Sequence, residues 1–330
     1  MTEHRTPAQV LATAARAAGL APSVHNTQPW LWRVHRDRLD LYAQRDRQLK
    51  LADPDGRLLT ISCGAALHHA RVALAAEGWQ SLVEPLPSPA DPDHLATIRL
   101  GEHAGAAAEA VRRFQLAQVR RTDRRPLANT PVPDAALAAI RAAVEAERAH
   151  LHLLRPEQVA ELALAASRAD ELAETDERQW AELAHWVGGP RPGTGVPAET
   201  IPTQPPRTTV PERDFGRAGT LAVSDNGDRA ATYGVIFGEV DAPPDWLAAG
   251  QALSAAWLAA TERGIALLPF SSPVEVPATR TVLRHLLAGI GHPFLALRLG
   301  VPDPDRPGPP HTPRLAPSET VEIVDAADAD

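Results

Sequence analysis

Residues 21–30 read APSVHNTQPW, and the rest of the chain is organised around this loop. It packs two prolines, a histidine and several hydroxyl or amide side chains into ten positions, directly after an amphipathic segment. Pro22 and Pro29 fix their own φ and disfavour helical backbone at Ala21 and Gln28. The loop is therefore predicted to be stiff.

The polar groups of this loop suggest a binding surface. Four side chains carry a hydroxyl or an amide: Ser23, Asn26, Thr27 and Gln28. An extended backbone between the prolines would also leave amides and carbonyls available to the edge of a flat heterocycle. A helix stop followed by a turn explains the same residues equally well, so the stretch alone leaves both interpretations open.

Length and composition set the frame. A chain of 330 residues exceeds the size that one core readily fills, so two domains or two fused halves are expected. Only 4% of the residues are aromatic, which favours closely packed helices, and the 32 prolines predict long irregular connections.

Charge and cysteine content exclude several classes. The net charge of −8 argues against non-specific nucleic-acid binding, which needs a dominant basic surface. The single cysteine, Cys63, permits no intrachain disulfide and suits a reducing compartment. The N-terminus has no signal-peptide pattern, and no run approaches the ~20 apolar residues of a membrane helix, so we expect a cytoplasmic protein without a membrane partner.

Apolar periodicity predicts a mixture of helices and strands. Helices are expected at residues 7–18, 58–77, 104–119, 134–148, 157–186, 244–263 and 277–288. Strands are expected at residues 30–34, 39–42, 81–84, 95–100, 150–154, 230–240, 265–270 and 294–299. The helix at 58–77 carries small residues, Gly64 among them, and is expected to be a central buried helix that another helix approaches closely.

Residues 188–211 interrupt this pattern. They contain eleven glycines and prolines and almost no periodicity. A connection of this length is uncommon in a compact domain unless it is a lid, a wrapping segment or disordered.

A basic stretch stands out from the acidic background. Six arginines fall within the fourteen residues 112–125. Arg120, Arg121 and Arg124, with the hydroxyl of Thr122, could clamp a phosphate, because guanidinium forks match phosphate oxygens. A solvated charged face that closes the preceding helix is the alternative, and the residues alone slightly favour it.

The histidines do not form a convincing metal site. His68 and His69 are neighbours on a predicted helix and cannot face one ligand together, whereas His150 and His152 share a strand face. Because no carboxylate or cysteine pattern accompanies the second pair, packing or surface roles are expected and no metal is predicted. The chain also has no glycine-rich phosphate loop and no serine-elbow motif.

Three stretches together resemble the signatures of nitroreductase-family flavoproteins. RRTDRRPL at 120–127, followed by PVPDAAL at 131–137, is similar to the opening signature, and APSVHNTQPW is similar to the Pro-Ser loop. GIALLPFSSP at 264–273 resembles the segment beside the flavin ring, and LRLGVP with the late Arg314 resembles the C-terminal strand and its phosphate-reaching basic residue.

The order of these motifs resembles one branch of the family, the Acg type, in which two fused halves imitate a dimer. HNTQPW, PERDF at 211–215 and TPR at 312–314 are similar to that branch. The resemblance implies an α+β, nitroreductase-like fold with an antiparallel or mixed sheet in each half. It places the halves at residues 1–118 and 119–330, the second with a C-terminal arm. The glycine- and proline-rich composition of residues 188–214 suggests a lid within this second half. One FMN per monomer is implied, and further dimerisation is compatible with it.

The resemblance also implies roles for individual residues. The FMN phosphate would be held by Arg120, Arg121, Thr122, Arg124 and Arg314. The loop of the other half would meet the cofactor through Pro22, Ser23, Val24, Asn26 and Gln28. The isoalloxazine ring would lie against Pro269, Phe270, Ser271 and Ser272. No catalytic acid or base is required, because the flavin carries the redox chemistry.

Four positions depart from the common family pattern: Pro126, Leu127, Leu268 and His292. These departures make the identity of the substrate less certain than the binding of a flavin.

Three functions follow from these patterns. The leading one is an FMN-dependent oxidoreductase that passes electrons from NAD(P)H to a nitroaromatic, quinone or similar small acceptor. The alternative is a protein that sequesters FMN beneath a lid with little turnover. A flavin-free scaffold that binds an acidic partner through its arginines is the least favoured.

Overall fold

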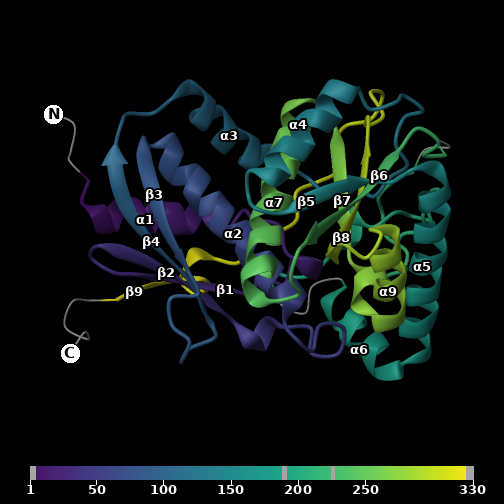
Figure 1. Cartoon of the computed structure of the whole chain (residues 1–330), viewed down its shortest axis with the longest axis horizontal. Coiled ribbons are helices and arrows are strands. Elements are labelled where there is room, and N and C mark those ends of the chain that lie inside the picture. The colour runs from purple at the N-terminus through teal and green to yellow at the C-terminus, as the bar shows by residue number, and fades with distance from the viewer. Residues whose placement is uncertain (1–4, 188–191, 224–226, 325–330) are drawn as a thin grey trace.

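The computed structural model describes residues 5–187, 192–223 and 227–324, which form two sheets surrounded by helices (Figure 1). This confirms the predicted α+β class. Residues 188–191 of the predicted lid lie outside the described residues, as does the acidic tail after residue 324.

The first sheet has the strand order β3-β4-β2-β1-β9. Its strands are β1 (Trp30–Val34), β2 (Arg38–Ala43), β3 (Trp79–Pro85), β4 (His94–His103) and β9 (Val321–Ile323). The β1–β2 hairpin follows the prediction, but β9 was not foreseen. It pairs in parallel with β1, placing Val321 opposite Trp32, so the end of the chain completes the first sheet.

The second sheet has the order β5-β6-β8-β7, with every neighbouring pair antiparallel. Its strands are β5 (His150–Leu153), β6 (Thr232–Gly238), β7 (Ala266–Phe270) and β8 (His292–Gly300). The helices nearby are α4 (Asp134–Glu145), α5 (Pro156–Thr175), α6 (Glu177–Trp186), α8 (Ser272–Glu275) and α9 (Pro277–Leu286). The predicted helix at 157–186 is divided at Asp176, whose carboxylate accepts the backbone N–H of Arg178 and caps α6.

Two long helices meet between the sheets (Figure 1): α2 (Arg57–Ala76) and α7 (Pro243–Glu262). A Cβ on Gly64 would lie 2.2 Å from the Leu247 carbonyl oxygen, and one on Gly250 would lie 1.9 Å from that of Ile61. Only glycine permits this approach at either position. The expectation of a central buried helix with a close partner is confirmed.

Helix α2 also bears on the expectation that the chain has no membrane helix. It is the one helix of residues 5–187, 192–223 and 227–324 that is long and apolar enough to cross a membrane, with a mean hydropathy of 1.3 in its best window. The segment is not a run of apolar residues, because it contains Arg57, His68, His69 and Arg71. Because 89% of that window is buried inside the protein, α2 has the environment of a core helix.

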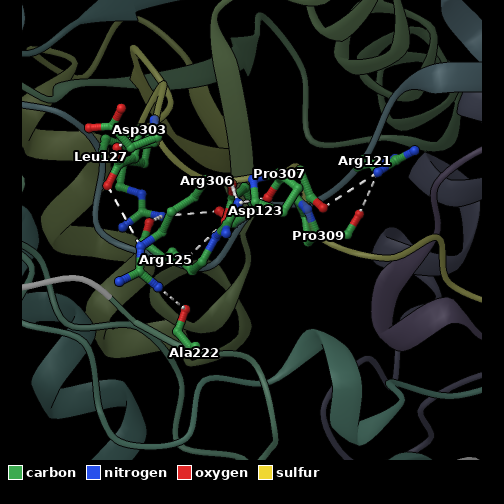
Figure 2. A network of polar contacts seen from close by, with 12 residues as sticks. Arg121, Asp123, Arg125, Leu127, Ala222, Asp303, Arg306, Pro307 and Pro309 are labelled. Carbon is green, nitrogen blue, oxygen red and sulfur yellow. Dashed lines mark hydrogen bonds and ion pairs between the residues drawn. The ribbon is translucent and has the colours of Figure 1, made fainter.

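The remaining helices are α1 (Pro7–Ala18), which packs on α2, and α3 (Ala108–Val119), which leads into the basic stretch. The C-terminal arm, residues 301–316, runs past that stretch. The carbonyl oxygens of Pro307 and Pro309 accept hydrogen bonds from Arg125 and Arg121 (Figure 2). The division of the chain after residue 118 stays a prediction.

Candidate functional site

A cavity lies between the loop 21–30, helices α2 and α7, strand β7 and the C-terminal arm. Its empty space is about 1070 Å³, a figure that includes the mouth open to solvent. Twelve of the fourteen predicted binding residues line it: Pro22, Ser23, Val24, Asn26, Arg120, Thr122, Arg124, Pro269, Phe270, Ser271, Ser272 and Arg314. The fold thus joins segments from both ends of the sequence.

The loop 21–30 is strained, and it is not extended as the sequence suggested. It contains a short 3-10 turn, Val24–Asn26. The φ angles are 44° at His25, 56° at Asn26 and 49° at Gln28. Left-handed backbone at non-glycine residues costs on the order of 1–3 kcal/mol each and persists only where the surroundings enforce it. Such strain is typical of binding sites.

Hydrogen bonds from other segments hold this backbone. The Ser62 hydroxyl on α2 accepts the backbone N–H of Val24 at 3.1 Å, and the Ser23 hydroxyl accepts that of Gln28 at 2.9 Å. Both hydroxyls therefore stabilise the loop backbone. The Ser23 hydroxyl has less hydrogen-bonding capacity left for a ligand than the sequence implied.

Asn26 connects the loop to two distant segments. Its Nδ2 donates to the carbonyl oxygens of Gly195 at 3.1 Å and Pro313 at 3.0 Å. Its Oδ1 accepts from Arg314 Nη1 at 3.1 Å. Asn26 thus fixes the position of Arg314 at the cavity wall.

Two predicted binding residues, Gln28 and Arg121, do not line the cavity. Gln28 donates through Nε2 to the Gly193 carbonyl oxygen at 2.7 Å and accepts the backbone N–H of Leu315 at 3.0 Å. Arg121 donates through Nη1 to the Pro309 carbonyl oxygen at 2.9 Å (Figure 2). Both residues hold the C-terminal arm, which carries Arg314 into the site.

Arg120 is a buried cation without an ordinary partner. Its guanidinium lies over the Trp257 ring, 4.3 Å from the ring centroid. Among the described residues, Nε and Nη1 have no hydrogen-bond partner, and the same holds for Nε of Arg314. Burial and the nearby Arg314 lower the pKa of Arg120 to about 9, and burial lowers that of Arg314 to about 10. This end of the cavity favours an anion.

Arg124 has a different environment. Its Nη1 donates to the Thr200 carbonyl oxygen at 3.2 Å, and its guanidinium carbon lies 5.3 Å from the centroid of the Phe215 ring. Burial lowers its pKa, while Glu212 acts in the opposite direction. Arg124 therefore connects the cavity wall to the predicted lid segment.

Glu212 introduces a carboxyl group into the same wall. Its Oε1 lies 2.6 Å from Arg298 Nη1, which also pairs with Asp228 at 2.7 Å. Burial raises the pKa of Glu212 to about 7, although Arg298 and Arg124 oppose the shift.

The two serines after β7 are already engaged by carboxyl groups. The Ser271 hydroxyl donates to Glu275 at 2.6 Å, and Glu275 is paired with Arg213. The Ser272 side chain lies beside Asp170, whose pKa burial raises to about 6. This part of the cavity therefore offers a ligand mainly backbone and the Phe270 side chain.

Comparison with known proteins gives the family. No family model matches the chain. However, a protein of Mycobacterium tuberculosis provisionally named NAD(P)H nitroreductase Rv3131 is 38% identical over 328 residues, covering 98% of this chain and 94% of the relative. The chain belongs to the nitroreductase family. The resemblance inferred from the motifs is confirmed.

Two further relatives and one solved structure are also similar to the chain. The M. tuberculosis protein provisionally named NAD(P)H nitroreductase acg is 32% identical, with 98% of each chain covered. The uncharacterised protein Rv3127 of the same organism is 30% identical over 95% of this chain and 93% of its own. A solved nitroreductase with bound FMN from Desulfitobacterium hafniense DCB-2 is 15% identical and covers 65% of this chain and 98% of its own, with a TM-score of 0.41.

The cavity of this nitroreductase-family chain also contains residues that the sequence did not single out as binding residues. They are His25, Leu58, Ile61, Ser62, Val196, Glu212, Arg213, Phe215, Leu253, Trp257, Leu268, Leu295 and Thr312. The i, i+4 spacing of Leu253 and Trp257 on one predicted helix face was the available signal. For Glu212, Arg213 and Phe215, only the PERDF motif pointed to importance, and it gave no role.

Part of the predicted lid lies at the cavity. Val196, Glu212 and Arg213 contribute to its wall together with Phe215, the next residue after the predicted lid. The His25 and Phe215 rings meet edge to face with centroids 6.1 Å apart. A second cavity of about 1390 Å³, open to solvent, lies beyond this wall and shares Arg124 and Phe215 with it. In the part of the chain that the structure describes, no group of three or more His, Cys, Asp or Glu residues is arranged for a metal.

Proposed function

We propose that this chain is an FMN-dependent oxidoreductase of the nitroreductase type. It takes electrons from NAD(P)H and passes them to a nitroaromatic, quinone or similar acceptor. It holds one FMN per chain, as an internal pseudo-dimer. The observation that carries the proposal is Arg120, a buried guanidinium that lines the cavity and whose side chain makes no hydrogen bond to any described residue.

The residues present fit FMN. Arg120 and Arg314 provide two positive charges for the phosphate, and Thr312 and Thr122 add hydroxyl groups to the same cavity. Bound FMN would supply hydride and electron transfer, which no side chain here provides. Arg124 is assigned to the wall, because it already bonds to Thr200.

The chain's own residues would orient the flavin and exclude water. Leu253, Leu295 and Phe270 give apolar surface, and the strained loop adds Val24 to the same lining. A rigid, apolar enclosure favours one ring position and strengthens electrostatic interactions inside it. The names of the mycobacterial relatives and the FMN-bound nitroreductase accord with this assignment.

A visible spectrum tests the cofactor. Purified protein, or protein incubated with FMN and desalted, should show flavin absorbance at one FMN per chain. Mixing with NADPH or NADH under anaerobic conditions should bleach the flavin, and adding a nitroaromatic or a quinone should restore the colour. Protein that stays colourless after incubation with FMN would rule out the proposal.

Sequestration of FMN is the second candidate, and the wall that Glu212, Arg213 and Phe215 help to form favours it. Arg213 of this wall is held by a buried ion pair with Glu275, 2.5 Å between Nη2 and Oε2. A fixed wall would shield the flavin from a nicotinamide. Bound flavin that keeps its colour with either nicotinamide, yet bleaches with dithionite, would favour this function.

Opening the wall separates the two functions further. Phe215→Ala removes the ring that lies between His25 and Arg124 and between the two cavities. In a sequestering protein, this variant should be reduced by NADPH much faster than the wild type. In a working reductase, it should change the reduction rate only modestly. Val240→Ala, at an exposed position away from the cavity, is the control.

A further inference from the structure

Unpartnered buried nitrogens concentrate around one point of the molecule. The described residues contain ten buried side-chain nitrogen or oxygen atoms without a hydrogen-bond partner, and five of them belong to Arg120, Arg314 and His69. Buried polar groups are normally satisfied, so such a cluster requires an explanation. The two arginines line the proposed flavin cavity, whereas His69 does not.

His69 lies on the stripe of α2 that faces the site. Ser62, which lines the cavity, is seven residues earlier, and a separation of seven residues returns to nearly the same helix face. His69 is only 2% exposed, and neither ring nitrogen has a partner among the described residues.

His69 and Arg120 each lie one helical turn from a shared contact between helices. Val72 on α2 packs in one buried cluster with Ala117 on α3 and Leu258 on α7. His69 is one turn before Val72, and Arg120 is one turn after Ala117. Burial lowers the pKa of His69 well below its ordinary value, and Arg120, His68 and Arg314 act in the same direction. The imidazole is therefore neutral and keeps a free acceptor nitrogen.

Arg120 has unpartnered N–H donors that could bond to the acceptor nitrogen of His69. Nε and Nη1 of its guanidinium are both buried and have no hydrogen-bond partner among the described residues. Nη2 is not among the buried unpartnered atoms and makes no hydrogen bond to a described residue, so it is the nitrogen left for a cavity ligand. A ligand that binds along the side of Nη2 and Nε leaves Nη1 without a partner.

We infer that His69 is a positioning residue for phosphate binding: its imidazole accepts a hydrogen bond from Nη1 of Arg120 and fixes the guanidinium toward the phosphate of a flavin mononucleotide. This inference rests on the FMN binding proposed above. The bond forms as Arg120 turns toward the phosphate. It gives one unpartnered nitrogen of each side chain a hydrogen-bond partner.

The neighbouring histidine provides a matched control. His68 Nδ1 lies 2.8 Å from the Ser254 hydroxyl, and Nε2 lies 3.8 Å from Glu147. It is equally part of α2 and buried, but its contacts are with α7 and the residues after α4. A change at His68 tests the general effect of replacing a buried histidine on this helix.

The experiment compares FMN with riboflavin, which lacks the phosphate. Dissociation constants are measured by flavin fluorescence quenching for wild type, His69→Leu, His69→Gln and His68→Gln, together with the melting temperature without flavin. His69→Leu should bind FMN at least about tenfold more weakly and bind riboflavin as the wild type does. His69→Gln keeps an acceptor and should stay within about threefold for FMN, as should His68→Gln.

The FMN-free melting temperature of His69→Leu should equal or exceed that of the wild type, because the variant removes an unsatisfied buried imidazole. Unchanged FMN affinity in His69→Leu would overturn the inference, as would an equal loss for FMN and riboflavin. If the wild type binds FMN and either of these two contrary results is obtained, only the proposed role of His69 is wrong. If wild type binds no FMN, the proposed function falls with it.

Discussion

Two groups of buried arginines use the same side chain in opposite ways. In the paired group, Arg125, Arg213 and Arg298 each meet a carboxylate, and the shortest N–O distances are 2.7, 2.5 and 2.6 Å. In the unpaired group, Arg120 and Arg314 line the cavity and form no ion pair with a described residue. Figure 2 shows part of the paired group, with Arg125 bonded to Asp123 and Pro307.

The difference separates structural from binding arginines. A buried charge is costly unless an opposite charge and hydrogen bonds compensate it. The paired group is compensated within the chain, so it stabilises one arrangement of strands and loops. The unpaired group has no compensating charge within the described residues, so a bound anion would stabilise it. Both contain members of the 112–125 stretch, so the sequence motif mixes two functions.

The largest expected effect comes from breaking the paired group. Arg298→Met leaves Glu212 and Asp228 as buried carboxyl groups without their shared cation. The free energy of unfolding, measured with urea, should fall by about 3–5 kcal/mol. Arg33→Met is the control, because its pair with Glu322 is exposed and should contribute less than about 1 kcal/mol. Equal effects in both variants would contradict the comparison.

Arg120→Met should weaken FMN binding without lowering the stability of the flavin-free protein. Removing a cation without an internal partner should leave the flavin-free free energy of unfolding unchanged or higher, since the methionine fills the space beside Trp257. FMN binding should weaken by about tenfold to a hundredfold. Arg121→Met is the neighbouring control and should retain FMN better, because Arg121 only holds the arm. Isothermal titration of all three proteins measures the difference.

Asn26→Ala tests how the unpaired group is held. The variant loses the bonds to Gly195, Pro313 and Arg314 and places alanine at a φ of 56°. We expect about 1–2 kcal/mol of destabilisation and several-fold weaker FMN retention after desalting. Asn26→Asp keeps the Arg314 contact and tolerates the backbone, so it should retain more FMN than the alanine variant. No loss in either variant would make the loop a simple turn.

The smallest expected effect on stability concerns Asp53, a buried carboxylic acid that, like the unpaired arginines, forms no ion pair with a described residue. Burial raises its pKa to about 6, although the Leu59 backbone N–H donates to it at 2.9 Å. Because the folded-state pKa lies above the ordinary value of 3.8, the folded protein binds the extra proton, and stability falls as pH rises from about 4 to 6. Asp53→Asn should be more stable than wild type at pH 7 by on the order of 1 kcal/mol, with no difference at pH 3.5. Urea titrations at both values give the comparison.

Much of this organisation could be predicted from the sequence. Periodicity located the long helices, including the buried α2, and the motifs located twelve residues that share one cavity. Local patterns suffice there, because a helix face or a proline-bounded loop is encoded by neighbouring residues. The strand β9 was missed, since three residues without strong alternation gain their pairing only from the edge of β1.

The binding roles were predictable only in part. Gln28 and Arg121 carry the expected side-chain chemistry, but their hydrogen bonds go to the C-terminal arm. Glu212 was not assigned a role, because its importance comes from Arg298, which is 86 positions later in the sequence. No local signal encodes such a contact.

The loop 21–30 and the arginines after α3 show where sequence information ends. By itself, the sequence determined that a stiff polar loop, a cluster of cations and a strand ending in serines exist, because each depends on residues close together in the chain. Tertiary structure decided that the loop is left-handed at three positions and that Arg125 is paired while Arg120 is not. The physical reason is that compensation of a buried charge depends on which distant carboxylate the sheets and the arm bring within hydrogen-bond distance.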